Sequence, residues 1–134
     1  MRASRVWTGV SLLTIVGLAP YLAAPDILNC PTCELYSGDS LTAVGATKSY
    51  SFAVKGGHTY SVTLQPSAGN PNLYLRYGAT PTTKSWDCRP NSSGTTVETC
   101  TARPTSSGTE YLVVSADSAP ATYVLWACDS AICK

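Results

Sequence analysis

The chain has 134 residues and a formal net charge of +1, and 13% of its residues are charged. This length corresponds to one domain rather than two, and the near-neutral charge gives no electrostatic reason to bind nucleic acid or an anionic membrane. Charged residues are scarcer than the roughly 25% of ordinary soluble domains. The abundance of Ser, Thr, Gly and Pro instead favours short strands and turns and excludes a coiled coil or a helical bundle.

The first 24 residues are typical of a secretory signal peptide. A short basic segment, residues 1–5, precedes 19 uncharged and largely apolar residues, 6–24, which end in two alanines. A retained membrane anchor is the alternative, because about 20 apolar residues can span a bilayer. Polar residues such as Thr8 and Ser11 dilute the segment. We therefore predict a signal peptide at residues 1–24, secretion of the remainder, and no membrane association after cleavage.

All six cysteines follow this segment, as Cys30, Cys33, Cys88, Cys100, Cys128 and Cys133. An even number of cysteines in a short exported chain indicates disulfides. Their spacing separates a middle pair, Cys88 and Cys100, from two close pairs near the termini. We expect the N-terminal pair to be joined to the C-terminal pair, because the termini of a domain often lie close together. The individual partners within these two pairs are left open.

The Cys30-Pro-Thr-Cys33 motif has two other interpretations. Together with Cys128 and Cys133 it could form a four-thiolate zinc site, and alone it could be a thioredoxin-like redox motif. Both suit a reducing cytosol better than an exported chain, and the redox motif also needs a βαβ context that this sequence lacks. We therefore predict structural disulfides, no metal and no other cofactor.

A linker with this Cys-x-x-Cys motif is expected at residues 25–33, followed by one domain of strands and turns at residues 34–134. Alternation of apolar and polar residues predicts half-buried strands over residues 49–54 and 59–65. The residues between them, 55–58, include two glycines, which accept positive φ angles, so this segment is predicted to be a hairpin turn.

Five further strands are predicted over residues 73–77, 86–88, 97–101, 111–115 and 123–127. The segment at 111–115 is almost continuously apolar, as expected for a central strand covered on both faces. No convincing helix follows the signal segment. Seven or eight short strands separated by turns predict an all-β fold, an antiparallel β-sandwich stapled by disulfides.

The stretch from residue 49 to residue 127 resembles the bacterial pre-peptidase C-terminal domain. The resemblance is carried by the hairpin at residues 50–64 and by three later motifs: Asn72-Leu-Tyr-Leu-Arg-Tyr-Gly78, Pro81-Thr-Thr-Lys-Ser-Trp-Asp-Cys-Arg-Pro90 and Glu98-Thr-Cys100. It implies a jelly-roll-like sandwich with a Cys88–Cys100 bridge. It also implies a non-catalytic module of the kind appended to secreted proteases and other exported hydrolases.

The chain departs from the family pattern in two respects. The family usually carries acidic residues before its Leu-Tyr motif, whereas this chain has the amides Asn70 and Asn72. Neutral amides bind Ca²⁺ more weakly than carboxylates. In addition, no protease sequence precedes the module here, so a stand-alone secreted version is expected.

No set of catalytic residues is expected. His58 is the only histidine, it lies in the glycine turn, and the chain has no nucleophile-elbow motif. Asp87 and Glu98 could be imagined as a glycosidase pair, because a bridge between Cys88 and Cys100 would bring them together. A polar loop beside a disulfide explains these two carboxylates better.

The candidate binding residues are Tyr74, Arg76 and Trp86. Tyr74 and Arg76 alternate with Leu73 and Leu75, so they are expected to be exposed if the leucines lie in the core. An exposed aromatic and arginine face could stack on a sugar or hold an extended peptide. The alternative is that Tyr74 packs against a second sheet or under a loop.

The sequence favours an exported, non-enzymatic module that binds an extracellular protein or polysaccharide. The main alternative is a structural subunit that assembles with itself into a fibre or surface layer, because a lone small sandwich has sheet edges. A small hydrolase is the weakest of the three hypotheses. Nucleic acid is not an expected partner.

Overall fold

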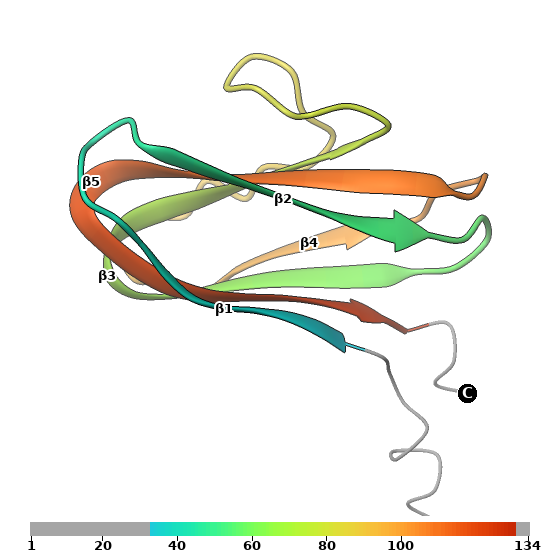
Figure 1. Cartoon of the computed structure of the whole chain (residues 1–134), viewed down its shortest axis with the longest axis horizontal. Helices are drawn as coiled ribbons and strands as arrows, with labels where there is room; N and C mark the ends of the chain where they lie inside the picture. The colour runs from blue at the N-terminus through green and yellow to red at the C-terminus, as the bar shows by residue number, and fades with distance from the viewer. Residues whose placement is uncertain (1–32, 131–134) are drawn as a thin grey trace, which may run out of the picture.

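The computed structural model describes residues 33–130, which form five β-strands and no helix. In chain order they are β1 (Cys33–Leu41), β2 (Thr47–Val54), β3 (Tyr60–Tyr77), β4 (Glu98–Ala102) and β5 (Gly108–Asp129). Every strand pair is antiparallel (Figure 1). The all-β fold predicted from the sequence is therefore confirmed. The described residues contain no helix long and apolar enough to span a membrane.

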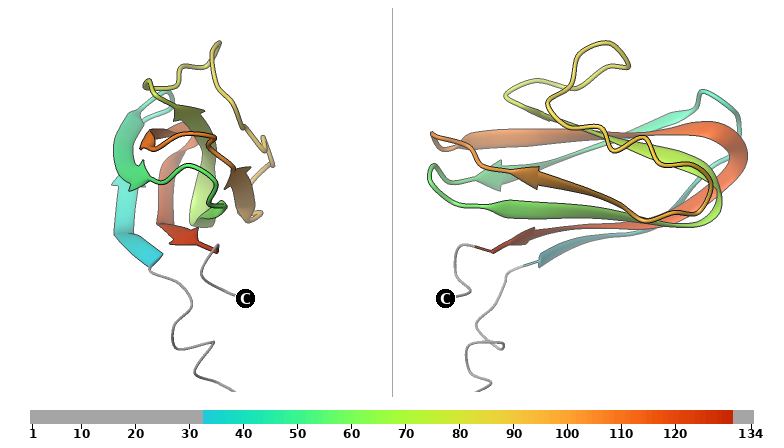
Figure 2. Two further views of the ribbon diagram at one scale, coloured as in Figure 1. Left: turned by 90° about the vertical axis from the view of Figure 1, so that its right-hand side faces the viewer. Right: turned by 180° about the vertical axis from the view of Figure 1, so that it is seen from behind.

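The two longest strands, β3 and β5, bend near their middles and curl the sheet over itself. One layer, the β2 layer, contains β2 with the first half of β5 and the second half of β3. The other, the β1 layer, contains β1, the second half of β5, the first half of β3, and β4. Figure 2 shows the two layers stacked in the end-on view. Each bent strand belongs to both layers. As a result, β3 takes the place of the strands predicted at 59–65 and 73–77, and β5 takes the place of those predicted at 111–115 and 123–127.

Gly69 allows the bend of β3 to lie against the bend of β5. Its φ angle is +73°, and a Cβ at this position would lie 2.5 Å from the carbonyl oxygen of Pro120 and 2.7 Å from the Cα of Ala121. Only a residue without a side chain fits this close approach and this left-handed conformation. The pairing of β3 with β5 is irregular between Pro66 and Pro71, which is where the layers change over.

The core lies between the two layers. The predicted alternation is confirmed in β2 and β3, where Phe52, Val54, Val62 and Leu64 are all buried. The β2–β3 hairpin also turns at residues 55–58 as predicted, with the N–H of His58 donating to the Lys55 carbonyl.

In β5 the adjacent residues Val113 and Val114 are both buried. Since successive side chains of a strand point to opposite faces, both faces of this strand are covered, as its continuous apolar run predicted.

Two of the predicted boundaries differ from the structure. The segment at residues 86–88 is not a strand, because Cys88 forms only an isolated bridge with Leu75. Conversely, β1 was not expected, since Cys33–Leu41 lacks a regular apolar alternation. Its pairing with β5 is interrupted between Tyr36 and Asp39, which is the physical reason that the period-two pattern is absent.

The two ends of the described chain are joined by a disulfide between Cys33 and Cys128, whose Cα atoms lie 4.1 Å apart. The prediction that an N-terminal cysteine bonds a C-terminal one is confirmed for this pair, which sits at the first register position of β1 and β5. Cys30, Cys133, the predicted signal peptide and most of the predicted linker lie outside the described residues.

Candidate functional site

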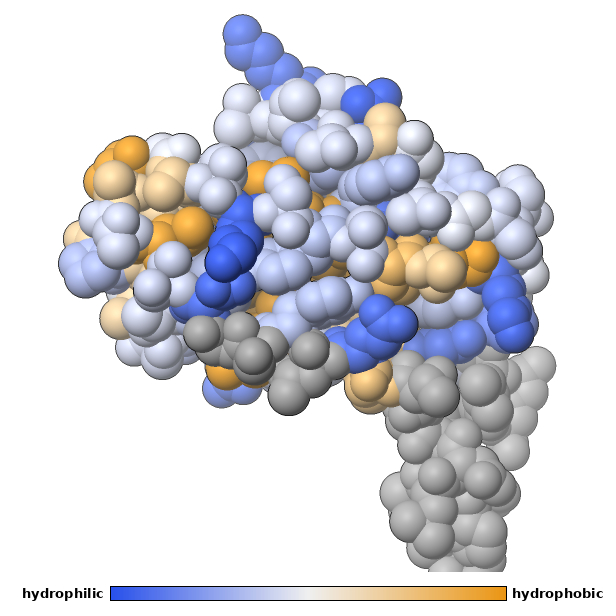
Figure 3. Space-filling model, viewed as in Figure 1, coloured by the Kyte–Doolittle hydropathy of each residue, from blue (hydrophilic) through white to orange (hydrophobic). Residues whose placement is uncertain are grey.

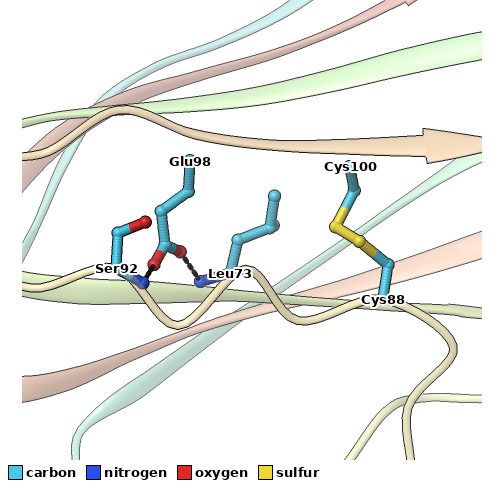
Figure 4. The surroundings of a disulfide bond; sticks show 5 residues. All are labelled: Leu73, Cys88, Ser92, Glu98 and Cys100. Atoms are coloured by element: carbon cyan, nitrogen blue, oxygen red, sulfur yellow. Dashed lines mark hydrogen bonds between the residues drawn. A yellow bond between two sulfur atoms is a disulfide. The ribbon is translucent and has the colours of Figure 1, made fainter.

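A long loop, residues 78–97, connects β3 to β4 and rises from the β2 layer (Figures 1 and 2). Its return segment is bound to β3 by the backbone of Leu75, whose N–H donates to Cys88 and whose carbonyl accepts the N–H groups of Asp87 and Cys88. The predicted Cys88–Cys100 disulfide is present and fastens the same segment to β4 (Figure 4). The loop is thus attached to both layers.

Glu98 adds a second connection between the layers. Its side chain is buried at the start of β4. Its Oε2 accepts the N–H of Leu73 in β3 at 2.7 Å, and its Oε1 accepts the N–H of Ser92 in the loop at 2.6 Å (Figure 4). Burial raises the pKa of this carboxyl, while the two backbone N–H groups oppose that shift. Glu98 therefore acts as an acceptor that holds the loop in place.

We expect Glu98→Gln to lower the free energy of unfolding by about 2 kcal/mol, because the new NH₂ group would face one of two buried N–H donors and leave it without an acceptor. Urea titration at neutral pH would measure the loss. Glu34→Gln removes an exposed carboxylate of β1 and serves as the control. Equal stability of the wild type and Glu98→Gln would contradict the role of Glu98 in holding the 78–97 loop against β3.

Tyr74 is buried and not exposed, so the structure agrees with the alternative given above, that this side chain packs under a loop. The residue does point away from Leu73 and Leu75, and it pairs across the strands with Val113 on the outer face of the β2 layer. However, its side chain is only 3% exposed, and the guanidinium of Arg89 lies 5.0 Å from the centre of its ring. The 78–97 loop covers this face, which no periodicity in the strand could have indicated.

Trp86 and Arg76 remain accessible, to different extents. Trp86 is 43% exposed, whereas Arg76 is half-buried. Their chain neighbours are joined, because Asp87, next to Trp86, accepts the N–H of Tyr77, next to Arg76, at 2.8 Å. The candidate surface therefore consists of Trp86 and Arg76 without Tyr74.

His58 lies in the turn between β2 and β3 as predicted, where it is half-buried and paired. Its Nδ1 lies 2.8 Å from Oδ2 of Asp129, and its ring stacks on Tyr60. The hydroxyl of Ser130, the residue after Asp129, donates to the Thr59 carbonyl. This pair therefore joins the β2–β3 turn to the end of β5, and Ser130 is not placed as its nucleophile.

Glu110 is a candidate that sequence reasoning missed. It lies at the start of β5 on the inner face, where it pairs with Phe52 on one side and Tyr77 on the other. Burial, and secondly the negative charge of Asp87, raise the pKa of this carboxyl from its ordinary 4.5 to about 7. The available signal was its spacing, because Glu110 shares a strand face with Leu112 and Val114.

Among residues 33–130, no group of three or more His, Cys, Asp or Glu side chains could hold a metal ion.

A curled antiparallel sheet with a loop anchored by a disulfide defines a class of small β-sandwich modules. The sequence profile of the bacterial pre-peptidase C-terminal domain matches residues 46–116, more than half of the chain. The chain belongs to this family, as the resemblance implied. The family is a non-catalytic C-terminal module of secreted proteases.

The chain is similar to the terminal parts of much longer enzymes. Alkaline serine exoprotease A of Vibrio alginolyticus is 35% identical over 94 residues, which is 67% of this chain and 17% of that protease. The virulence metalloprotease of Vibrio anguillarum is 42% identical over 65 residues, which is 48% of this chain and 10% of that enzyme. The chain thus spans less than a fifth of the length of these two relatives.

Among solved structures, the periplasmic lysozyme inhibitor PliG of Aeromonas hydrophila has a TM-score of 0.59 at 17% identity, and the match covers 76% of this chain and 89% of PliG. The pre-peptidase C-terminal domain of Bacillus anthracis collagenase has a TM-score of 0.53 at 19% identity, with 73% and 89% covered. At these identities the likeness shows a shared fold.

Proposed function

We propose that this protein is an exported, non-catalytic module that binds a protein or polysaccharide outside the cytoplasm through the surface formed by Trp86 and Arg76. Membership of a family of accessory modules supports the non-catalytic role. The six cysteines, and a basic N-terminus followed by the uncharged and largely apolar residues 6–24, support export. The observation that carries the proposal is an exposed tryptophan on a loop fixed to both layers.

An exposed tryptophan held in this way suits recognition. Asp87 and Cys88, which follow it directly, are hydrogen-bonded to Leu75, and Cys88 is also in a disulfide. The backbone that carries the indole is therefore ordered before any partner arrives, so binding loses little conformational entropy. Tryptophan and arginine are also the side chains most enriched among residues that dominate binding energy.

The carboxylates considered for hydrolysis already have structural partners. Glu98 accepts two backbone N–H groups, and Asp87 accepts the N–H of Tyr77. A general acid or base must reach the proton that it transfers, whereas these groups are engaged within the fold. Their engagement supports a binding role over a glycosidase.

Binding to collagen, chitin, peptidoglycan and g-type lysozyme is the direct test. We expect at least one of them to be bound, and Trp86→Ala to weaken that binding about thirtyfold, since loss of a central aromatic anchor costs about 2 kcal/mol. Val44→Ala is the matched control, because Val44 is 70% exposed but lies in the β1–β2 turn.

Equal affinity of the wild type and Trp86→Ala for a bound partner would exclude the Trp86 surface. Size-exclusion chromatography over a range of concentrations tests the self-assembling alternative. Growth into filaments without binding to any of the four partners would favour a structural subunit. Turnover of peptides, esters or glycosides that His58→Ala or Asp87→Ala abolishes would overturn the non-catalytic role.

A further inference from the structure

A pocket of about 220 Å³ opens between the two layers at the end where β3 and β4 finish and β5 begins. The end of β3 and the start of β5 supply one wall, and the residues at and after the end of β4 supply the other. The loop contributes Asp87 and Cys88. The charged lining residues are Asp87, Arg103 and Glu110, and Leu75, Ala102 and Pro104 supply apolar surface.

Glu110 is the unusual member of this lining. Only 3% of the residue is exposed, and its Oε1 is buried without a hydrogen-bond partner among the described residues. Buried carboxylates are normally paired, because an unpaired charge out of water is costly. Here the neighbours in register are Phe52 and Tyr77, neither of which carries a positive charge. The carboxyl therefore lines the pocket with acceptor capacity unused.

Asp87 adds a second negative group at the same pocket. Its Oδ2 accepts the N–H of Tyr77, which fixes the side chain toward this end of β3. The residue is exposed, so it lies on the solvent side, whereas Glu110 lies inside. The two carboxylates are close enough for the charge of Asp87 to disfavour ionisation of Glu110. A positive charge entering the pocket would meet Asp87 and Glu110 and relieve their repulsion.

We propose that this pocket receives the side chain of a lysine or arginine from a protein partner, with Glu110 binding its charged end. This inference rests on the proposed binding function and names the chemistry of the partner, because Asp87 directly follows Trp86. The walls formed by Leu75, Ala102 and Pro104 suit the aliphatic stem of such a side chain.

A metal ion fits the pocket less well than a basic side chain. Ca²⁺ takes six to eight oxygen ligands, whereas this pocket is lined by two carboxylates, and its cysteine, Cys88, is already in a disulfide. Arg103 is the one positive group in the lining and is exposed. Its positive charge would repel a basic side chain, so removing it should strengthen binding, whereas removing Glu110 should weaken it.

The experiment is an NMR titration of the ¹⁵N-labelled protein with acetyl-Gly-Lys-Gly-amide, with the norleucine peptide of the same length as the uncharged control. We expect the lysine peptide to shift the amide signals of Tyr77, Asp87 and Glu110, and the norleucine peptide to leave them unchanged. Glu110→Gln should weaken binding at least tenfold, and Arg103→Gln should strengthen it. Binding should also be at least tenfold weaker at pH 5.5 than at pH 8, where Glu110 is mostly ionised.

The pocket assignment would be overturned if the two peptides bound equally or if Glu110→Gln bound the lysine peptide as the wild type does. It would also be overturned if CaCl₂ shifted these amide signals and the lysine peptide did not. Equal shifts with free spermidine would overturn it too, because they would make a small polyamine the ligand. Trp86→Ala separates this inference from the proposed function. It should leave the short lysine peptide bound, because the indole does not line the pocket. Failure of every macromolecular partner to bind, with the lysine peptide still bound, would reject the proposed function alone.

Discussion

Replacing Cys33 and Cys128 with serine should lower the free energy of unfolding by about 5 kcal/mol. The two cysteines are separated by 95 residues, and closing so long a loop removes much entropy from the unfolded chain. The bond also holds the paired ends of β1 and β5 together. The comparison is best made in a background in which Cys30 and Cys133 are already serine, so that neither can replace a missing partner.

Urea unfolding of the two proteins under identical conditions measures this loss. The second disulfide is a matched control, because Cys88 and Cys100 are only 12 residues apart, and removing that bridge should cost about 3 kcal/mol on the same entropic grounds. If the long loop contributed less than the short one, constraint of the unfolded chain would not be the main effect of the Cys33–Cys128 bond.

The parts of the fold that depend on local alternation were predictable from the sequence. The strands around Phe52, Val62 and Leu112 follow a period of two or a continuous apolar run, and the glycines at 56 and 57 mark the turn between two of them. The bends of β3 and β5 were not predictable in this way. They depend on how Gly69 packs against a segment some 50 residues later in the chain, which a local pattern does not record.

In the candidate site, too, some features were predictable from the sequence and others depended on long-range contacts. The Cys88–Cys100 bridge was accessible through motif resemblance, and the direction of Tyr74 through alternation. The sequence could offer the burial of Tyr74 only as an alternative to exposure, because the residue that covers its ring, Arg89, belongs to a loop whose path is set by Leu75, Cys100 and Glu98. Sequence patterns locate a side chain on a strand face, but long-range contacts decide whether that face meets solvent.

The burial of Asn72 explains why an amide can stand where the family usually has an acidic residue. The side chain is completely buried on the outer face of the β2 layer, opposite Ser115, and its polar atoms have no hydrogen-bond partner among the described residues. An ionised aspartate in this environment would be far costlier to bury than an amide. The amide at this position is therefore consistent with a neutral, covered site.

The stability of the protein should fall as the pH rises from about 4.5 to 7, and Glu110 should be a principal cause. In the folded state, burial and the charge of Asp87 raise the pKa of Glu110 to about 7, so the folded protein holds this proton more tightly than the unfolded chain does. The resulting stabilisation is complete below the ordinary pKa of 4.5 and is lost as the pH passes the folded value. A shift of this size corresponds to about 3 kcal/mol.

Glu110→Gln keeps the shape of the side chain and removes its ionisation, so it should be more stable than the wild type at pH 8 and differ little from it at pH 4.5. Urea titrations of both proteins at half-unit pH steps would measure the difference. The raised pKa of Glu98 acts in the same direction, whereas hydrogen bonds from Lys48 and then Tyr50 lower the pKa of Asp39 and act in the opposite one, at lower pH. These groups are present in both proteins and cancel in the comparison. Parallel pH profiles for the wild type and Glu110→Gln would mean that folding does not raise the pKa of Glu110, and would reject the buried, unpaired carboxylate on which the basic-side-chain pocket depends.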